Sequence, residues 1–204
     1  EIFGANTVVS TGGAGVVSIT ASGGNFQTQS IIQSNSGAIS ISTDGQALQT
    51  LNNGAISSFN GGAINLTGGT VGSNSFAQID ATFGNQTISG NPDITLIGGA
   101  SGGSASRGNV ADIIIGLGAT SSAGVQTISA RNLTLVGGGA GSVENFALIG
   151  AASGETQIIA ASGAVALTGG AGADAGAVIG NPGGVGFVPF GNVNITLNGM
   201  IKDG

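Results

Sequence analysis

Short apolar segments separated by glycine-rich turns recur along the chain. One motif consists of an apolar residue, any residue, leucine, any residue and two glycines. It occurs as Ile64-Asn-Leu66-Thr-Gly68-Gly69, Ile94-Thr-Leu96-Ile-Gly98-Gly99, Leu133-Thr-Leu135-Val-Gly137-Gly138 and Val165-Ala-Leu167-Thr-Gly169-Gly170, and returns as Ile195-Thr-Leu197-Asn-Gly199. These five segments begin 30, 39, 32 and 30 residues apart. Because residues two apart lie on one face of a strand, each segment predicts a short β-strand with one buried face.

Two further motifs follow the first in a fixed order. The second reads Phe76-Ala-Gln-Ile79, Val110-Ala-Asp-Ile113, Phe146-Ala-Leu-Ile149 and Gly176-Ala-Val-Ile179. The third reads Gln86-Thr-Ile-Ser89, Gln126-Thr-Ile-Ser129 and Gln157-Ile-Ile-Ala160, and we expect Phe187-Val188-Pro189-Phe190 to replace it in the last repeat. No segment is long enough for a helix, so each repeat predicts three strands.

Repetition of three strands at one period predicts an all-β fold, a right-handed parallel β-helix (β-solenoid) with 30–39 residues per coil. Successive coils would stack about 4.8 Å apart, and equivalent residues would form a continuous core. We expect one inward column of Ile64, Ile94, Leu133, Val165 and Ile195, and a second of Leu66, Leu96, Leu135, Leu167 and Leu197. A glycine-rich β-sandwich is the main alternative, but it would show hairpin turns instead of ordered motifs.

The N-terminal region repeats less regularly. Val17-Ser-Ile19 and Ile39-Ser-Ile41 resemble the first motif, and Gln49-Thr50-Leu51 resembles the third. Their spacing of 22 to 25 residues predicts shorter coils. We therefore expect one solenoid domain over residues 1–204, irregular over 1–60 and regular over 61–204.

Composition narrows the classes of function. Glycine supplies 42 of 204 residues, but 40% of residues are hydrophobic, which a disordered chain would lack. The net charge of −6 and only three basic residues argue against binding to nucleic acid. The longest apolar runs, such as Ile113-Ile114-Ile115, are far shorter than the ~20 residues of a membrane-spanning helix, so we expect no membrane insertion.

The residue types of common active sites are largely missing. The chain has no histidine and no cysteine, which removes the usual catalytic bases, nucleophiles and thiolate metal ligands. The acidic residues Asp80, Asp93, Asp112, Glu144, Glu155 and Asp174 are scattered and are expected to be solvated loop charges. We expect no two of them in matching positions of adjacent coils, and Asp80 and Asp112 on opposite faces. The sequence therefore predicts no enzyme activity, no catalytic residues, no metal site and no cofactor.

Polar residues at equivalent positions carry further expectations. Gln86, Gln126 and Gln157 should stack as a row of amides. Thr87 and Thr127 would stack outward, but Ile158 interrupts the row that an ice-binding face would need.

Two other features are candidates for contacts with partners. Phe76 and Phe146 are equivalent, and packing explains them better than a carbohydrate-binding groove does. The loop over residues 98–109, which carries Arg107, should bulge from the shaft and offer the likeliest specific contact, so that its partial deletion would hardly affect stability.

The stretch from Gln126 to Ala140 joins the third motif to the first and its glycines. In this pattern, residues 45–199 resemble filamentous-haemagglutinin-like exoproteins, the large secreted bacterial adhesins of two-partner secretion. The resemblance implies a right-handed β-helix shaft at the cell surface, used for adhesion, biofilm formation or filament building.

These observations predict an extracellular or bacterial cell-surface protein that serves as a non-catalytic structural or adhesive fibre segment. The expected partners are other copies of the chain or further coils of a longer chain, because strand-like segments near both ends would template another coil. Surface glycans are a further expected partner. The alternative is a carbohydrate-binding or polysaccharide-cleaving β-helix protein.

Overall fold

The computed structural model describes residues 8–11, 17–21, 26–28, 31–34, 38–43, 48–51, 56–58, 63–70, 72–73, 76–81, 85–103, 108–115, 124–151, 155–180, 192–197 and 201–203. Within these ranges the chain is all-β, contains no helix, and pairs its strands in parallel. An all-β fold with parallel strands is therefore confirmed.

Three sheets contain most of the strands. Sheet 1 has the order β2 (Val17–Ala21), β5 (Ala38–Thr43), β8 (Ala63–Thr67), β11 (Asp93–Ile97), β15 (Leu133–Val136), β19 (Val165–Thr168) and β22 (Ile201–Asp203). Sheet 2 has the order β3 (Phe26–Thr28), β6 (Leu48–Leu51), β9 (Ala77–Ala81), β13 (Ala111–Ile115), β17 (Ala147–Ala151) and β20 (Ala177–Ile179). Sheet 3 has the order β7 (Ile56–Ser58), β10 (Gln86–Ser89), β14 (Val125–Ala130), β18 (Thr156–Ala161) and β21 (Asn192–Leu197).

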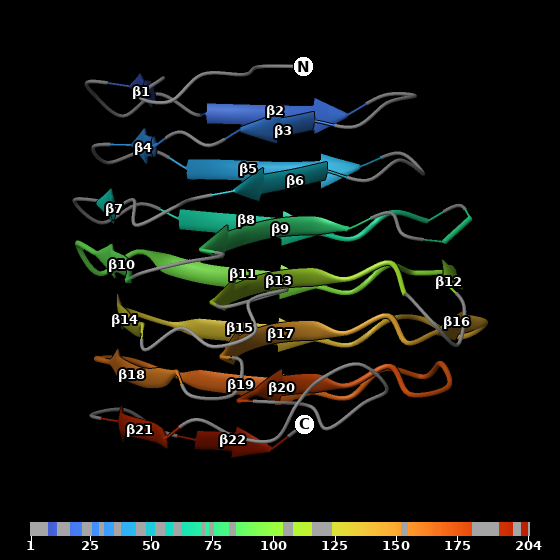
Figure 1. Ribbon diagram of the computed structural model, residues 1–204. Helices are drawn as coiled ribbons and strands as arrows, with labels where there is room; N and C mark the ends of the chain where they lie inside the picture. Colours follow the sequence, from blue (N-terminus) through green and yellow to red (C-terminus); the bar gives the residue numbers. More distant parts are fainter. Residues whose placement is uncertain are drawn as a thin grey trace.

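The chain visits these sheets in a fixed sequence. From β8 it passes to β9 in sheet 2 and β10 in sheet 3, and then returns to sheet 1 as β11. We call the stretch from one strand of sheet 1 to the next a circuit. Figure 1 shows the strands of successive circuits lying in rows, from blue β2 to red β22.

The predicted motifs occupy matching positions in neighbouring circuits. In sheet 1, Ile64, Ile94, Leu133 and Val165 pair in register, as do Leu66, Leu96, Leu135 and Leu167. Burial alternates along β8 and β11, so these residues face inward, and the core joins them to the inward residues of sheets 2 and 3. Both columns are confirmed for these four circuits.

The predicted place of the last motif is wrong. Ile195 and Leu197 lie in β21, where they pair with Ile159 and Ala161 of sheet 3. The next position in sheet 1 is taken by β22, in which Ile201 pairs with Val165. Residues 187–190 lie outside the described residues, and β21 occupies the place of the third motif that we had expected them to fill.

The N-terminal motifs are assigned correctly in sheet 1 and wrongly in sheet 2. Val17 pairs with Ile39, and Ile39 pairs with Ile64, so both segments continue the first motif at the expected short spacing. Gln49 pairs with Gln78 in β9, which places the segment expected to be a third motif in sheet 2. Another pair of strands, β1 (Val8–Thr11) and β4 (Ile31–Ser34), forms a separate two-stranded sheet among the described residues.

The loops that connect a strand of sheet 1 to the following strand of sheet 2 also pair with one another. Strands β12 (Gly102–Gly103) and β16 (Ser142–Val143) pair with each other, and Val143 forms a bridge to Ala173 in the next circuit. The loop over residues 98–109, which we expect to bulge from the shaft, is therefore also paired, in its described part, with the equivalent loop of the next circuit. Arg107 lies outside the described residues.

Close approach of the backbone requires glycine at two of the positions that end the first motif, Gly98 and Gly137. A Cβ atom on Gly98 would lie 2.2 Å from the carbonyl oxygen of Asn145, and one on Gly137 would lie 2.1 Å from that of Ala175. The neighbouring N–H of Gly99 donates a 2.7 Å hydrogen bond to the carbonyl of Asn109, which closes the loop before sheet 2. Close approach, and not a positive φ angle, therefore explains these glycines.

Candidate functional site

A row of buried glutamines lies between sheets 2 and 3. Gln126 donates from Nε2 to Oε1 of Gln86 at 2.6 Å, and Gln157 donates in the same way to Gln126 at 2.6 Å. All three side chains are buried, and their amides also donate to main-chain carbonyls of sheet 2, such as that of Ile149. The expected row of amides is confirmed. It links three consecutive circuits inside the core.

A second row of buried amides closes the loop that follows sheet 1. Asn145 donates from Nδ2 to the carbonyls of Gly99 at 2.8 Å and Ser101 at 3.1 Å, and its Oδ1 accepts from the main-chain N–H of Asn109 at 2.7 Å. Asn109 donates from Nδ2 to Gly72 and Ser101, each at 3.1 Å. Sequence analysis missed both asparagines, although their shared position before the second motif was a usable signal.

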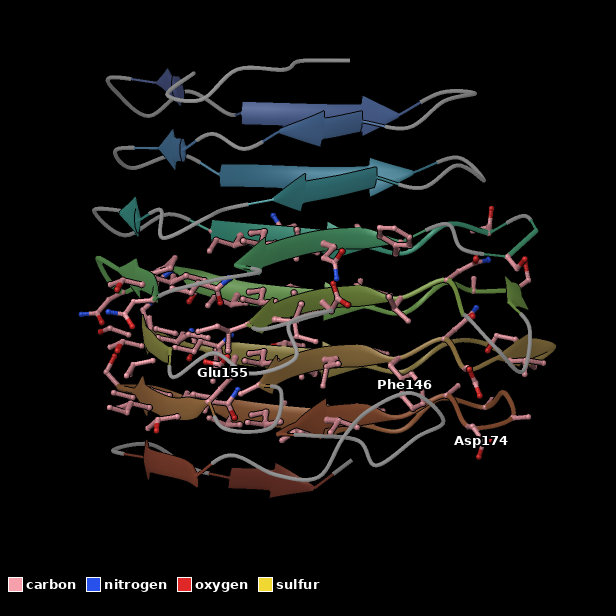
Figure 2. All side chains as sticks on the ribbon, in the orientation of Figure 1. Phe146, Glu155 and Asp174 are labelled. Atoms are coloured by element: carbon pink, nitrogen blue, oxygen red, sulfur yellow. The ribbon has the colours of Figure 1, made fainter. Side chains whose placement is uncertain are left out.

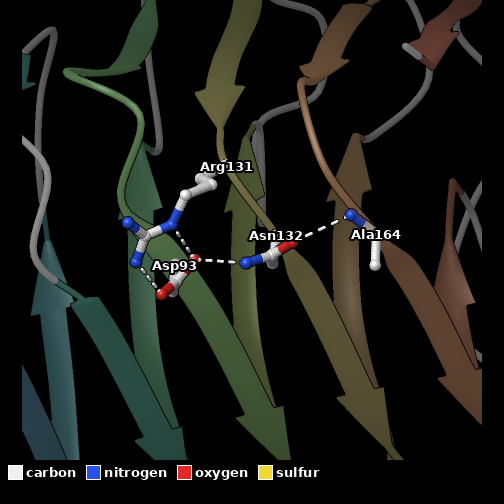
Figure 3. Close-up of polar contacts among 4 residues, drawn as sticks. All are labelled: Asp93, Arg131, Asn132 and Ala164. Atoms are coloured by element: carbon white, nitrogen blue, oxygen red, sulfur yellow. Dashed lines mark hydrogen bonds and ion pairs between the residues drawn. The ribbon is translucent and has the colours of Figure 1, made fainter. Parts of the chain in front are cut away.

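The corner between sheets 3 and 1 carries a polar cluster that spans three circuits (Figure 3). Arg131 forms a two-pronged ion pair with Asp93, in which Nε donates to Oδ1 at 2.8 Å and Nη2 donates to Oδ2. Asn132 donates from Nδ2 to Asp93 at 2.7 Å and accepts from the N–H of Ala164 at 2.8 Å. The cluster therefore joins β11, β15 and the start of β19.

The corner cluster shifts the titration of its two charged members. The hydrogen bonds from Arg131, followed by those from Asn132, hold the pKa of Asp93 below its ordinary value, although partial burial opposes the shift. The carboxylate in turn raises the pKa of the Arg131 guanidinium. Both side chains are partly exposed, with 34% for Asp93 and 57% for Arg131, so water screens their attraction.

Two further acidic residues are buried, which contradicts the expectation of solvated loop charges. Asp112 lies within β13 at 4% exposure, where its Oδ2 accepts from Nε2 of Gln78 at 3.3 Å. Glu155, labelled in Figure 2, lies just before β18 at 1% exposure. Burial runs along every residue of β13 and β17, so both faces of these two strands are covered.

The predicted separation of the acidic residues is partly wrong. Asp80 pairs with Ile114, two residues from Asp112, so positions 80 and 112 lie in different columns but on one face of sheet 2. The bridge between Val143 and Ala173 places Glu144 and Asp174 in matching positions of neighbouring circuits, with φ angles of 54° and 51°.

The outward rows of the third motif are arranged as expected. Thr87 pairs with Thr127, and Thr127 pairs with Ile158, so the isoleucine does interrupt the row of threonines. Phe76 and Phe146 precede paired alanines of sheet 2, which confirms that they occupy equivalent positions.

The described residues bring together hydrogen-bonding groups but few that could react. They contain no group of three or more acidic residues that could hold a metal ion. In the same part of the chain no helix is found that could cross a membrane. The polar clusters can therefore bind neighbouring circuits to each other, and Asp93 already forms an ion pair with Arg131.

Comparison of the chain with protein-family models, with curated proteins and with solved structures finds no match.

Proposed function

We propose that the chain is a segment of a right-handed parallel β-helix that serves as a non-catalytic structural or adhesive shaft outside the cell. Its setting would be a bacterial surface, as for the filamentous-haemagglutinin-like exoproteins that its motifs resemble. Its partners would be further coils, from the same longer chain or from other copies, and surface glycans.

One observation carries the proposal: the buried polar side chains bond from one circuit to the next. Gln126 bonds to glutamines in the circuits before and after it, and Asn145 bonds to main-chain groups of the preceding circuit. Buried hydrogen bonds of this kind hold neighbouring circuits together and fix the register of the rows. Such an arrangement suits a rod that must hold its shape.

The arrangement of Asp93 and Asp112 also favours a non-catalytic role. Hydrolysis of glycosidic bonds commonly uses two carboxyl groups that face each other across a substrate. Asp93 is instead held by Arg131, and Asp112 accepts from Gln78 on a strand that is covered on both faces.

The proposal is tested by presenting the purified chain with a panel of neutral and acidic polysaccharides. A reducing-sugar assay and a binding assay run side by side separate cleavage from adhesion. We expect no release of reducing ends, with or without binding. Sustained release of reducing ends that is abolished by Asp112→Asn or by Asp174→Asn would show that the protein is a polysaccharide-cleaving enzyme.

A further inference from the structure

Four asparagines of the chain stand two residues before a threonine. They are Asn65, Asn85, Asn132 and Asn194, and the residue between is never proline. Enzymes that attach sugars to asparagine recognise this pattern and join the sugar to Nδ2 of the side chain. The structure separates the four positions, because attachment requires an asparagine and a threonine that an enzyme can reach.

Three of the four asparagines lie within a strand or have an amide that is hydrogen-bonded at both ends. Nδ2 of Asn132 donates to Asp93 at 2.7 Å, and its Oδ1 accepts from the N–H of Ala164 at 2.8 Å. Asn65 is half-buried in the middle of β8, which pairs with β5 on one side and β11 on the other. Asn194 lies within β21, which pairs with β18.

Asn85 is the exposed member among the described side chains of the set. It lies at the corner just before β10, and its Oδ1 accepts from the main-chain N–H of Val125 in β14 at 2.9 Å. Because a main-chain N–H can only donate, the atom that faces β14 must be the amide oxygen. The two polar atoms of an amide diverge from one carbon, so this bond directs Nδ2 away from β14.

The threonine of the same pattern faces outward as well. Thr87 lies between Gln86 and Ile88, which are both buried. Since side chains alternate along a strand, Thr87 points away from the core, where it is half-buried and pairs with Thr127. An enzyme that approaches from solvent can therefore meet Asn85 and Thr87 together.

We propose that Asn85 is a glycosylation site, modified by an enzyme that takes the sugar from a sugar phosphate. Nδ2 of Asn85 attacks C1 of the sugar. The new bond between C1 and Nδ2 forms as the bond from C1 to a phosphate oxygen breaks, the phosphate leaves with the electron pair, and Nδ2 loses one proton. The sugar would project from the corner before β10, opposite the buried Gln86, and so would leave the row of amides intact. This inference goes beyond the proposed function, because a shaft needs no sugar of its own.

Mass spectrometry of the protein from the cells that produce it tests the proposal. Peptides that contain Asn85 and Asn132 are fragmented, so that any sugar is located on its residue. We expect a sugar on Asn85 and none on Asn132. A single hexose would indicate a nucleotide-linked donor, and a preassembled oligosaccharide would indicate a lipid-linked donor. Absence of sugar from Asn85, or a sugar on Asn132 instead, would overturn the proposal.

Glycosylation of the folded chain in solution gives a second readout. The unmodified chain is incubated with a soluble asparagine glycosyltransferase and uridine diphosphate glucose, beside synthetic peptides of residues 82–90 and 129–137. The peptides measure the preference of the enzyme for each sequence. After division by the rate of its own peptide, Asn85 should react roughly tenfold faster than Asn132, because Asn132 must first give up its hydrogen bond to Asp93. Equal corrected rates would contradict the proposal.

Substitutions of the threonines assign the reaction to this site. Thr87→Val should abolish modification of Asn85, whereas Thr87→Ser should retain it, because serine also satisfies the pattern. Thr134→Val is the matched control, since it removes the threonine that follows Asn132 and should leave Asn85 unaffected. Far-UV circular dichroism checks that each variant is folded. Modification of Asn85 that persists in Thr87→Val would contradict the proposal, as would its loss in Thr134→Val.

Discussion

The central glutamine of the buried row gives the sharpest test of how the circuits are held together. Gln126→Leu replaces a buried amide by an apolar side chain of similar size. The change removes the donor to Oε1 of Gln86 and the acceptor for Nε2 of Gln157, two hydrogen bonds of 2.6 Å. Gln157 keeps its 3.1 Å bond to the carbonyl of Ile149, whereas Oε1 of Gln86 loses the amide of Gln126 as its donor.

The magnitude follows from the groups left without partners. A buried polar atom that loses its partner costs about 1–3 kcal/mol, so we expect Gln126→Leu to lower the free energy of unfolding by about 2–4 kcal/mol. Replacing Gln86, Gln126 and Gln157 together by leucine should cost less than the sum of the three single changes, because no orphaned amide then remains.

Urea unfolding followed by far-UV circular dichroism measures this effect, since the chain has no tryptophan or tyrosine to report by fluorescence. The matched control is Thr127→Val, the next residue of β14, which is half-buried and outward and should change stability by less than about 0.5 kcal/mol. If Gln126→Leu were as harmless as Thr127→Val, or if the triple variant cost the sum of the single ones, the reasoning about the row would be refuted.

Three other predictions follow from the described contacts. Leu135→Asp should prevent folding, seen as loss of the β signal in circular dichroism, because it places a carboxylate in a fully buried column; a folded variant would show that this column is not the core. Asn145→Ala should lower the free energy of unfolding by about 2–4 kcal/mol, because it removes hydrogen bonds to Gly99, Ser101 and Asn109, whereas Asp174→Asn on the surface should stay within about 0.5 kcal/mol. Asp93→Asn should cost at most about 1 kcal/mol at neutral pH. Since the folded pKa of Asp93 is lowered, its contribution is complete above the ordinary value of 3.8 and is lost as the pH falls through the folded pKa. The difference between the wild type and Asp93→Asn should therefore vanish in acid, and a difference that persists there would contradict the ion-pair account.

The repeated motifs predicted the strands well because a strand with one buried face needs an apolar residue at every second position. Ile94 and Leu96 are two residues apart, as one inward face requires, and they do face the core. The three glutamines also paired as predicted, because in-register parallel strands place identical residues of successive repeats side by side.

The sequence could not determine which sheet each segment joins. An apolar pair such as Ile195 and Leu197 satisfies the inward positions of any sheet, so the motif could not distinguish β21 in sheet 3 from a strand of sheet 1. The main-chain pairing decides this, and it depends on the length of chain used in the preceding loops. For the same reason Gln49 was assigned to the wrong sheet.

The polar clusters were the least predictable part. Asp112 and Glu155 are buried although acidic residues are usually exposed, and only the three-dimensional environment reveals it. The pairing of Arg131 with Asp93 joins residues 38 apart, which become neighbours only when the circuits are in register.

Distances between spin labels along sheet 1 test the stacking of the circuits most directly. The register of sheet 1 aligns position 168 with position 67 three rows away, with position 42 four rows away and with position 20 five rows away. Three double-cysteine variants that share position 168, diluted with unlabelled protein, can be measured by pulsed electron resonance. The account predicts backbone separations of about 14, 19 and 24 Å, with an increment of about 4.8 Å per row. Distances that fail to rise in equal steps, or a label at position 42 that lies closer to position 168 than the label at position 67, would contradict the account.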